Sequence, residues 1–400
     1  MTPTSGTEAR ETRRHANFVR LFLGDTILHG FASALLGVFI PVFVYIVSGH
    51  SLYLTLLYFG GTHALYALLL PWCAHAITRL GFNRSLAIGM LMMAGFKATA
   101  VFVTQDTFLY LVPLLVLTIT FFRIFFWLPY HVDFTLFSDP AWRGREVGIV
   151  SSVRLLLGIV GPIIGGLVLA TAGFAPLFVF SVILYLIAAM YFLYLPEVHA
   201  RFEWTYTKTF SQLFSARYRQ ASTAFIAAGI DNHLNLILWP IFIFLLMEQA
   251  YFDMGIVLGL IAGIAALLRI LVGAYLDTSF QAKERMLRIG ATLHSMGWVF
   301  KTLVVTGPQI VLAGVYHSFS KLFLATSFTT LTYDRSADEK GCVDEFTVVH
   351  EVAINIGYAS AALITAGVYV ALGDIRYVFV VGVLSSLFLT TLTKRSTKRS

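Results

Sequence analysis

Residues 147–170 read VGIVSSVRLLLGIVGPIIGGLVLA, a run in which a single arginine is the only charged residue. A helix needs about 20 mostly apolar residues to cross a bilayer, so this run predicts a membrane-spanning helix. Its apolar residues are continuous rather than alternating, which favours a helix over a barrel strand. Similar runs occur along the whole chain and predict twelve spans: 18–47, 52–78, 85–104, 109–137, 147–170, 174–195, 223–247, 254–276, 286–305, 309–332, 346–372 and 377–392.

The composition agrees with a membrane protein. Of the 400 residues, 58% are hydrophobic and 12% are charged, whereas soluble domains have about 45–50% and about 25%. We interpret the net charge of +7 as basic cytoplasmic loops rather than a nucleic-acid-binding face. Cys73 and Cys342 form neither a disulfide framework nor a metal pattern. The first apolar run is too long for a cleaved signal, so we expect it to anchor the chain.

Basic residues indicate how the spans are oriented. If the N-terminus is cytoplasmic, twenty-one lysines and arginines fall in cytoplasmic segments, and only Arg376 falls on the opposite side. This asymmetry predicts a multi-pass protein of the inner or plasma membrane with both termini in the cytoplasm. The predicted parts are a cytoplasmic tail (1–17), an N-terminal six-helix bundle (18–195), a cytoplasmic central loop (196–222), a C-terminal six-helix bundle (223–392) and a second tail (393–400).

The two halves of the chain resemble each other at one constant offset. Residue numbers that differ by 199 align Pro41 with Pro240, Ala74 with Gly273, Arg84 with Lys283, Glu146 with Glu345, and Gly158 with Gly357. Because all these pairs share one offset, they predict two homologous bundles. Secondary transporters are commonly built from such repeats, with the substrate site near the midplane between them.

The loops that follow the second helix of each half carry parts of one motif. The first loop has Arg79, Gly81 and Arg84, and the second has Gly273, Asp277 and Lys283. With the twelve spans and the basic central loop, these residues resemble the major facilitator superfamily, although Ala74 and Thr78 replace a Gly and an Asp of its loop motif. The resemblance implies an all-α fold of two pseudo-symmetric six-helix bundles, with the six loop residues as cytoplasmic gate contacts. Ordinary topogenic charge is the alternative for these loops.

The fourth and fifth predicted helices carry a second resemblance. The stretch from Gly158 to Gly166 is similar to the Gly-Pro-x-x-Gly-Gly signature of proton-coupled antiporters, departing by one residue before Gly161. Arg123 stands where many antiporters place an arginine linked to proton movement, but the Gln-Gly that often follows is absent. Small residues let helices approach closely in lipid, and Pro162 can bend a helix. We favour a packing role for Gly158, Gly161, Pro162, Gly165 and Gly166.

Charged residues within spans are expensive, at roughly 2.5–3.5 kcal/mol each near the membrane centre on insertion scales. They persist where they line a wet cavity, pair with each other, or act chemically. The candidates for cavity charges or proton coupling are Asp25, Arg123, Arg154, Asp231, Lys321 and Glu351. Asp133, Arg269, Lys97 and Lys301 are the other charged residues in spans. A structural ion pair is the alternative for each candidate, and we expect Lys301 to reach the interface by snorkelling.

Polar residues on the same helix faces add candidates for substrate contact. They are His29, His63, Trp127, Tyr130, His131, Asn235 and His317. Several lie four residues from a charge, for example His29 from Asp25 and His317 from Lys321, and such residues share one helix face. Histidine can relay protons near neutral pH, although a hydrogen-bonded packing role is more common.

These features predict a secondary transporter that moves a small solute by alternating access and is coupled to protons. Export by antiport is slightly favoured over uptake by symport. A non-transporting receptor or sensor on the same scaffold is the alternative. An intramembrane enzyme is a third class, for which the sequence offers neither a metal cluster nor a nucleophile constellation. We expect no cofactor, no metal, no nucleic-acid partner and a monomer in the lipid bilayer. An anion, a zwitterion and a lipophilic cation all stay open as solutes.

Overall fold

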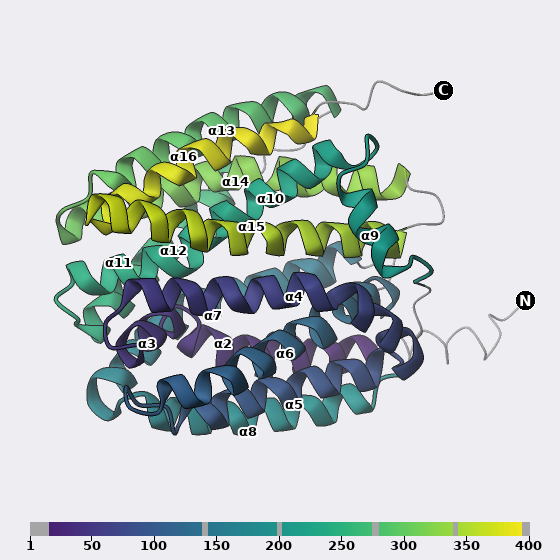
Figure 1. Cartoon of the computed structure of the whole chain (residues 1–400), viewed down its shortest axis with the longest axis horizontal. Helices are drawn as coiled ribbons and strands as arrows, with labels where there is room; N and C mark the ends of the chain where they lie inside the picture. Colours follow the sequence, from purple (N-terminus) through teal and green to yellow (C-terminus); the bar gives the residue numbers. More distant parts are fainter. Residues whose placement is uncertain (1–15, 138–142, 198–201, 274–279, 339–342, 394–400) are drawn as a thin grey trace, which may run out of the picture. The chain divides into compact units, whose positions relative to one another are not determined.

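The computed structural model describes residues 16–137, 143–197, 202–273, 280–338 and 343–393, and its regular elements are all helical (Figure 1). The elements are η1 (Phe22–His29), α2 (Gly30–Leu36), α3 (Ile40–Val47), α4 (Leu52–Leu80), α5 (Phe82–Ala100), α6 (Phe108–Phe137), α7 (Arg143–Ala172), α8 (Phe174–Leu193), α9 (Tyr206–Leu213), α10 (Arg219–His233), η2 (Leu234–Leu238), α11 (Trp239–Leu246), α12 (Tyr251–Gly273), α13 (Phe280–Thr302), α14 (Gly307–Asp338), α15 (Val343–Leu372), η3 (Ile375–Phe379), α16 (Val380–Phe388) and η4 (Leu389–Thr393). The described chain is therefore an all-α protein.

Ten helices in the described ranges are long and apolar enough to cross a membrane, which indicates a multi-pass membrane protein. The predicted spans 85–104 and 286–305 are not among the ten, although both are helical, as α5 and α13. Both helices carry basic residues along their length, namely Lys97 in α5 and Arg288 and Lys301 in α13. Charged residues within a span need protein around them rather than lipid alone.

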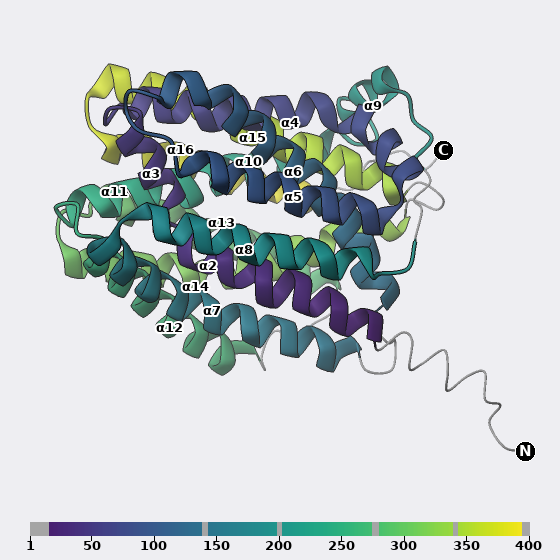
Figure 2. The ribbon, with the colours of Figure 1, turned by 90° about the horizontal axis from the view of Figure 1, so that it is seen from below.

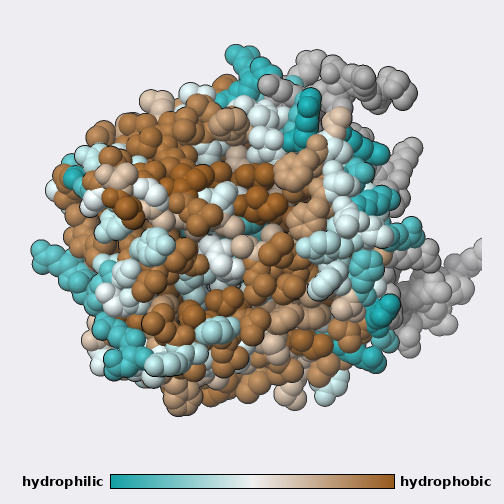
Figure 3. Space-filling view, viewed as in Figure 1, coloured by the Kyte–Doolittle hydropathy of each residue, from teal (hydrophilic) through white to brown (hydrophobic). Residues whose placement is uncertain are grey.

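The molecular surface has the distribution expected for lipid contact. On the face seen in Figure 3, hydrophobic residues cover the middle of the helices, and hydrophilic residues gather toward their ends. Large apolar side chains such as Leu156, Ile270 and Leu363 are exposed on separate helices. Soluble proteins rarely expose apolar area on this scale, so lipid is the natural solvent for this surface.

The first predicted span, 18–47, is not one continuous helix. A turn at 37–39 separates α2 from α3, and Pro41 lies in the first turn of α3. Proline lacks the N–H group that would bond the preceding turn, so the helix has to restart there. In the second half the helix continues past the corresponding proline, because the π-helical segment η2 joins α10 to α11, which has Pro240 in its first turn.

The short helices α3 and α11 repeat at the same offset that aligns Pro41 with Pro240. They have equal lengths, and their first residues, Ile40 and Trp239, differ by 199 in number. The residues that close them, His50 and Gln249, both have positive φ, at 60° and 67°. Both residues also donate backbone hydrogen bonds of 2.9 Å to the carbonyl five residues earlier. A positive φ is uncommon outside glycine, so its recurrence at this offset reflects a shared local structure.

The chain divides into two compact units, each described separately below. Unit 1 comprises Met1–Gly37 and Trp72–Phe202, and unit 2 comprises Val38–Pro71 and Glu203–Ser400. The segment Val38–Pro71 therefore packs with the second half of the chain. Gly60 of α4 lies at a close contact with α15, because a Cβ at this position would lie 2.8 Å from the Cβ of Ala362. The predicted bundles 18–195 and 223–392 stay a prediction.

Helix neighbours follow the same scheme inside each unit. In unit 1, α5 lies between α6 and α8, and α2 packs against α7 (Figures 1 and 2). In unit 2, α13 lies between α14 and α16, and α10 packs along α15 (Figure 1). The helices α5 and α13, which each bury a lysine, are therefore each covered by two other helices of their own unit.

Candidate functional site

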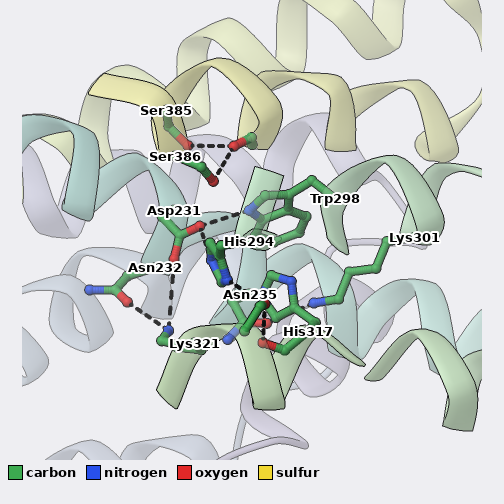
Figure 4. A network of polar contacts seen from close by, with 12 residues as sticks. Asp231, Asn232, Asn235, His294, Trp298, Lys301, His317, Lys321, Ser385 and Ser386 are labelled. Carbon is green, nitrogen blue, oxygen red and sulfur yellow. Dashed lines mark hydrogen bonds and ion pairs between the residues drawn. The ribbon is translucent and has the colours of Figure 1, made fainter. Parts of the chain in front are cut away.

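A buried carboxylate is the centre of a polar network in the described part of unit 2 (Figure 4). Asp231 lies near the end of α10, and its Oδ1 accepts hydrogen bonds from Trp298 Nε1 at 2.7 Å and His294 Nε2 at 2.9 Å. Its Oδ2 lies 3.7 Å from Lys321 Nζ. We call Asp231, His294, Trp298, Ser320 and Lys321 the Asp231 cluster. Three helices, α10, α13 and α14, supply it.

The hydrogen bonds of the Asp231 cluster link α13 to α14 behind the carboxylate. The Ser320 hydroxyl donates to the His317 carbonyl at 2.9 Å, and it also lies 3.3 Å from His294 Nδ1. His294 Nε2 donates to Asp231 Oδ1, so the imidazole lies between a carboxylate and a hydroxyl. Either ring nitrogen of a histidine can carry a proton, which suits it to a chain of hydrogen bonds that moves one.

Serine, histidine and aspartate in this order also occur in hydrolase triads. The Ser320 side chain is 0% exposed, and its proton is already donated to a backbone carbonyl. No substrate carbonyl can reach a nucleophile enclosed in this way. We therefore interpret the three residues as a proton-holding chain.

Lys301 lies beside the Asp231 cluster and is enclosed by aromatic rings. Its side chain is 1% exposed, and Nζ donates to Asn235 Oδ1 at 2.9 Å. The ammonium also lies 4.4 Å from the ring centre of Trp239 and 4.3 Å from that of Trp298. Such rings stabilise a desolvated cation. The predicted snorkelling of Lys301 is therefore wrong, because its aromatic neighbours and Asn235 hold the ammonium inside unit 2.

His317 does not share an open face with Lys321 as its spacing suggested. The ring is buried, with its centre 4.1 Å from that of His294 and 4.6 Å from that of Trp298. Neither of its ring nitrogens has a hydrogen-bond partner within the described structure. His317 therefore packs behind the cluster, while Lys321 extends to its exposed side, with 34% of its side chain accessible.

Unit 1 contains a second ion pair, centred on another buried aspartate. Asp25 lies in the π-helical segment η1, and its carboxylate accepts a hydrogen bond from Arg154 Nη2 of α7. The same Nη2 donates to the Tyr130 hydroxyl of α6 at 2.6 Å. Wide helical turns of this kind occur frequently at functional sites. Three predicted site residues on three helices therefore meet in one place.

His29 lies one turn after Asp25 and is surrounded by aromatic rings. Its ring centre is 5.0 Å from that of Phe126 and 5.7 Å from that of Tyr185. Its Nδ1 lies 3.5 Å from the Ser33 hydroxyl. The ring is buried, so its contacts are those of a packing residue behind the Asp25–Arg154 pair.

The other candidates lie apart from these two ion pairs. His63 and Tyr358 stack at 4.0 Å, and His63 Nδ1 lies 2.6 Å from Asn355 Oδ1. Glu351 accepts a hydrogen bond from the Tyr66 hydroxyl at 3.0 Å. All these residues belong to the contact of α4 with α15 in unit 2. In unit 1, Arg123 and Trp127 are partly buried on α6. His131 lies on the same helix, but its side chain is outside the described part.

The predicted gate loops are only partly described. Gly81 has a φ of +81° and directly precedes α5, a conformation that favours glycine. Arg84 lies 3.8 Å from Glu197, and both side chains are largely exposed. Arg79 is also exposed. Of the second loop, Gly273 ends α12, Asp277 lies outside the described residues, and the side chain of Lys283 is likewise not described.

One glycine of α7 lies at a close approach of two helices. A Cβ at Gly161 would lie 2.5 Å from the Cβ of Ala34 in α2, whereas a Cβ at Gly158 would meet nothing within 4 Å. Pro162, Gly165 and Gly166 are buried, and α7 continues through Pro162. The predicted packing role therefore applies directly to Gly161.

His294, Trp298 and Ser320 are not among the site residues predicted from the sequence. A signal was present, because His294, Trp298 and Lys301 lie four and three residues apart and share one helix face. Three polar or aromatic residues along one face of a span indicate a buried polar contact.

An apolar cavity of about 820 Å³ lies elsewhere in unit 2, between α12, α13 and α14. No charged side chain lines it, and its wall residues Leu303 and Leu312 are largely exposed. Its surface suits an acyl chain better than a polar solute. Across the described residues, no group of three or more potential ligands could hold a metal ion.

Comparison with known proteins identifies no relative for this chain. No protein-family model matches it, and no curated protein matches it at a significant level. The site is therefore interpreted from its own geometry.

Proposed function

We propose that the protein is a secondary active transporter of the major facilitator type, which moves a small solute by alternating access and couples this movement to protons. The observation that carries the proposal is the Asp231 cluster. It places a carboxylate and a lysine in the middle of two candidate membrane spans, beside a histidine of α13. Ionisable groups at such depth are costly, and in membrane proteins they mark ion and substrate pathways.

The cluster has the parts that proton coupling requires. His294 connects the Asp231 carboxylate to the Ser320 hydroxyl, so a proton that moves along this chain changes which group donates each hydrogen bond. A ligand or proton that favours one of two such states shifts their populations. Lys321 lies on the exposed side of the cluster, so a solute that binds to its ammonium can change the hydrogen bonds inside the cluster.

The proposed architecture rests on the repeated local structure. The short helices α3 and α11 recur at the offset that also aligns Pro41 with Pro240, and each unit has the same order of helix neighbours. Repeats of this kind are the basis of alternating access in many transporters. We also propose that the chain forms twelve spans in two bundles, that both termini lie in the cytoplasm, and that the solute is exported in exchange for protons. The resemblance around Arg123 and Gly158–Gly166 favours export, and uptake by symport is the second direction.

Purified protein in proteoliposomes tests this function. Radiolabelled solutes of different charge are offered under an imposed pH gradient, with and without a protonophore. We expect one class to accumulate against its gradient, and we expect the protonophore and the substitution Asp231→Asn to abolish accumulation. Asp106→Asn is the matched control, because Asp106 is an exposed residue between helices. Accumulation that survives both the protonophore and Asp231→Asn removes proton coupling, and the absence of any solute movement removes the transporter.

A further inference from the structure

The two central ion pairs expose their cations and bury their anions. In unit 2, the Asp231 side chain is 5% exposed and that of Lys321 is 34% exposed. In unit 1, the Asp25 side chain is 3% exposed and that of Arg154 is 46% exposed. A molecule that approaches either pair therefore meets a positive charge first. Each unit shows this asymmetry independently of the other.

The Lys321 ammonium is held loosely and can still donate hydrogen bonds. It has three N–H donors. Its contacts are Asn232 Oδ1 at 3.4 Å and Asp231 Oδ2 at 3.7 Å, both near the upper limit for such interactions. The short bonds to Asp231 come instead from His294 and Trp298. Asp231 therefore positions Lys321 without saturating it.

Arg154 has a donor edge that its own pair does not use. Its hydrogen bonds to Asp25 and to Tyr130 both come from Nη2. Within the described structure, no residue accepts a hydrogen bond from its Nε or Nη1. A guanidinium presents its donors as a planar fork that matches a carboxylate or a phosphate. The exposed edge of Arg154 has this geometry.

The groups around Asp231 also favour an anion over a cation. Asp231 is the one carboxylate of the cluster within the described residues, and its oxygens already accept the hydrogen bonds of His294 and Trp298 and face Lys321. A cation would meet the Lys321 ammonium first and be repelled, whereas an anion would be attracted to it.

We propose that the solute is an organic anion, recognised in unit 2 by the exposed Lys321 ammonium; in unit 1 the guanidinium edge of Arg154 offers an anion the same chemistry. The proposal rests on the transporter function argued above. A lipid headgroup has the same chemistry as a free anion, but Lys321 lies far from either end of its span, Gly307–Thr332. The distances along the helix are roughly 21 Å to the first of these residues and roughly 17 Å to the second. A soluble anion is therefore the expected ligand.

Binding is tested with the full chain in detergent and in nanodiscs of phosphatidylcholine, followed by thermal unfolding. Succinate, benzoate and inorganic phosphate are the anionic probes, tetraethylammonium and tetraphenylphosphonium the cationic ones, and sorbitol the neutral one. We expect at least one anion to raise the unfolding temperature and the other classes to have no effect. Stabilisation by the cations, or by none of the anions, overturns the proposal. Stabilisation by added phosphatidylglycerol alone assigns the site to lipid and also overturns it.

Substitutions then separate solute binding from a structural ion pair. We expect Lys321→Gln to weaken anion affinity about tenfold or more, as for the loss of one charge-assisted hydrogen bond. Lys208→Gln removes the same charge from an exposed residue outside the spans and should change nothing. The double variant Asp231→Asn/Lys321→Gln removes both charges of the pair together. If Lys321 binds the anion, the double variant stays weak, whereas recovery of wild-type affinity shows that the pair is only structural.

The outcomes also distinguish this proposal from the transporter function. Anion binding that depends on Lys321 without any solute flux removes transport and leaves the anion site in place. Coupled flux of a cation or a neutral solute leaves transport in place and removes the anion site. Each proposal can therefore fail without the other.

Discussion

Substituting Gly229 by alanine should force α10 and α15 apart at the point where they cross. A Cβ at Gly229 would lie 2.0 Å from the Ile354 carbonyl oxygen, and a Cβ at Gly357 would lie 2.1 Å from the Ile226 carbonyl oxygen. Ordinary van der Waals contact begins at 3.4 Å. The two helix backbones must therefore move apart until the new Cβ reaches that distance from the carbonyl oxygen. The atoms in the way are backbone rather than a movable side chain.

The size of the effect follows from this geometry. Overpacking that shifts backbone costs typically about 1–3 kcal/mol, and a gap of even roughly 0.5–1 Å forfeits a quarter to a half of the dispersion energy of the atoms lining it. We therefore expect Gly229→Ala to lower the free energy of unfolding by about 3 kcal/mol, the upper end of that range. The change should also reach the site, because Asp231 lies two residues after Gly229 and its short bonds to α13 depend on the position of α10.

Thermal unfolding in detergent, together with solute flux in proteoliposomes, measures both effects. Gly367→Ala is the control, because this glycine lies in α15 and a Cβ there would meet nothing within 4 Å. The control should unfold like the unaltered protein. Equal unfolding temperatures for Gly229→Ala and Gly367→Ala would refute the close crossing of α10 and α15.

Three further expectations follow from the structure. In α7, Gly161→Ala should destabilise unit 1, because its Cβ would meet Ala34, whereas Gly158→Ala one turn earlier should not; thermal unfolding of the two variants compares them. The side-chain hydrogen bonds from Arg376 hold the pKa of Asp374 below its usual value. The protection of the Arg376 amide in hydrogen exchange, which also depends on this carboxylate, should therefore be full near neutral pH and fall as the pH drops through that lowered pKa. If antiport exports one monovalent anion for each proton that enters, each cycle moves a net two positive charges inward. Symport of the anion with one proton moves no net charge. A membrane potential imposed with valinomycin should therefore change the flux only for antiport.

The sequence predicted the helical fold and the residues of the Asp25–Arg154 pair, because both depend on local patterns. Apolar runs of about 20 residues define spans, and Asp25, Tyr130 and Arg154 stand out as polar residues within such runs. Which carboxylate meets which cation depends on helix packing, and helix spacing alone left Asp231 with either Arg154 or Lys321 as a partner. The structure places Lys321 beside Asp231 and Arg154 beside Asp25.

The turn between α2 and α3 also had a sequence signal that was not used. Pro41 was noted as an aligned residue but not as a helix break, since proline is tolerated in many spans. The π-helical segments η1 and η2 have no comparable signal. They depend on how the surrounding helices satisfy backbone groups, which a single sequence does not show.

The two helices that hydropathy fails to recognise as spans are also those that bury a lysine in each unit. Lys97 of α5 lies 5.4 and 5.5 Å from the ring centres of Phe96 and Phe178, and Lys301 of α13 lies between Trp239 and Trp298. Hydropathy measures transfer into lipid, whereas these helices are inserted between other helices of their own unit. A span that carries buried charge must have protein neighbours, and those neighbours allow it to supply a site. For this reason α13, which is not among the ten candidate spans, can supply His294 and Trp298 to the Asp231 cluster.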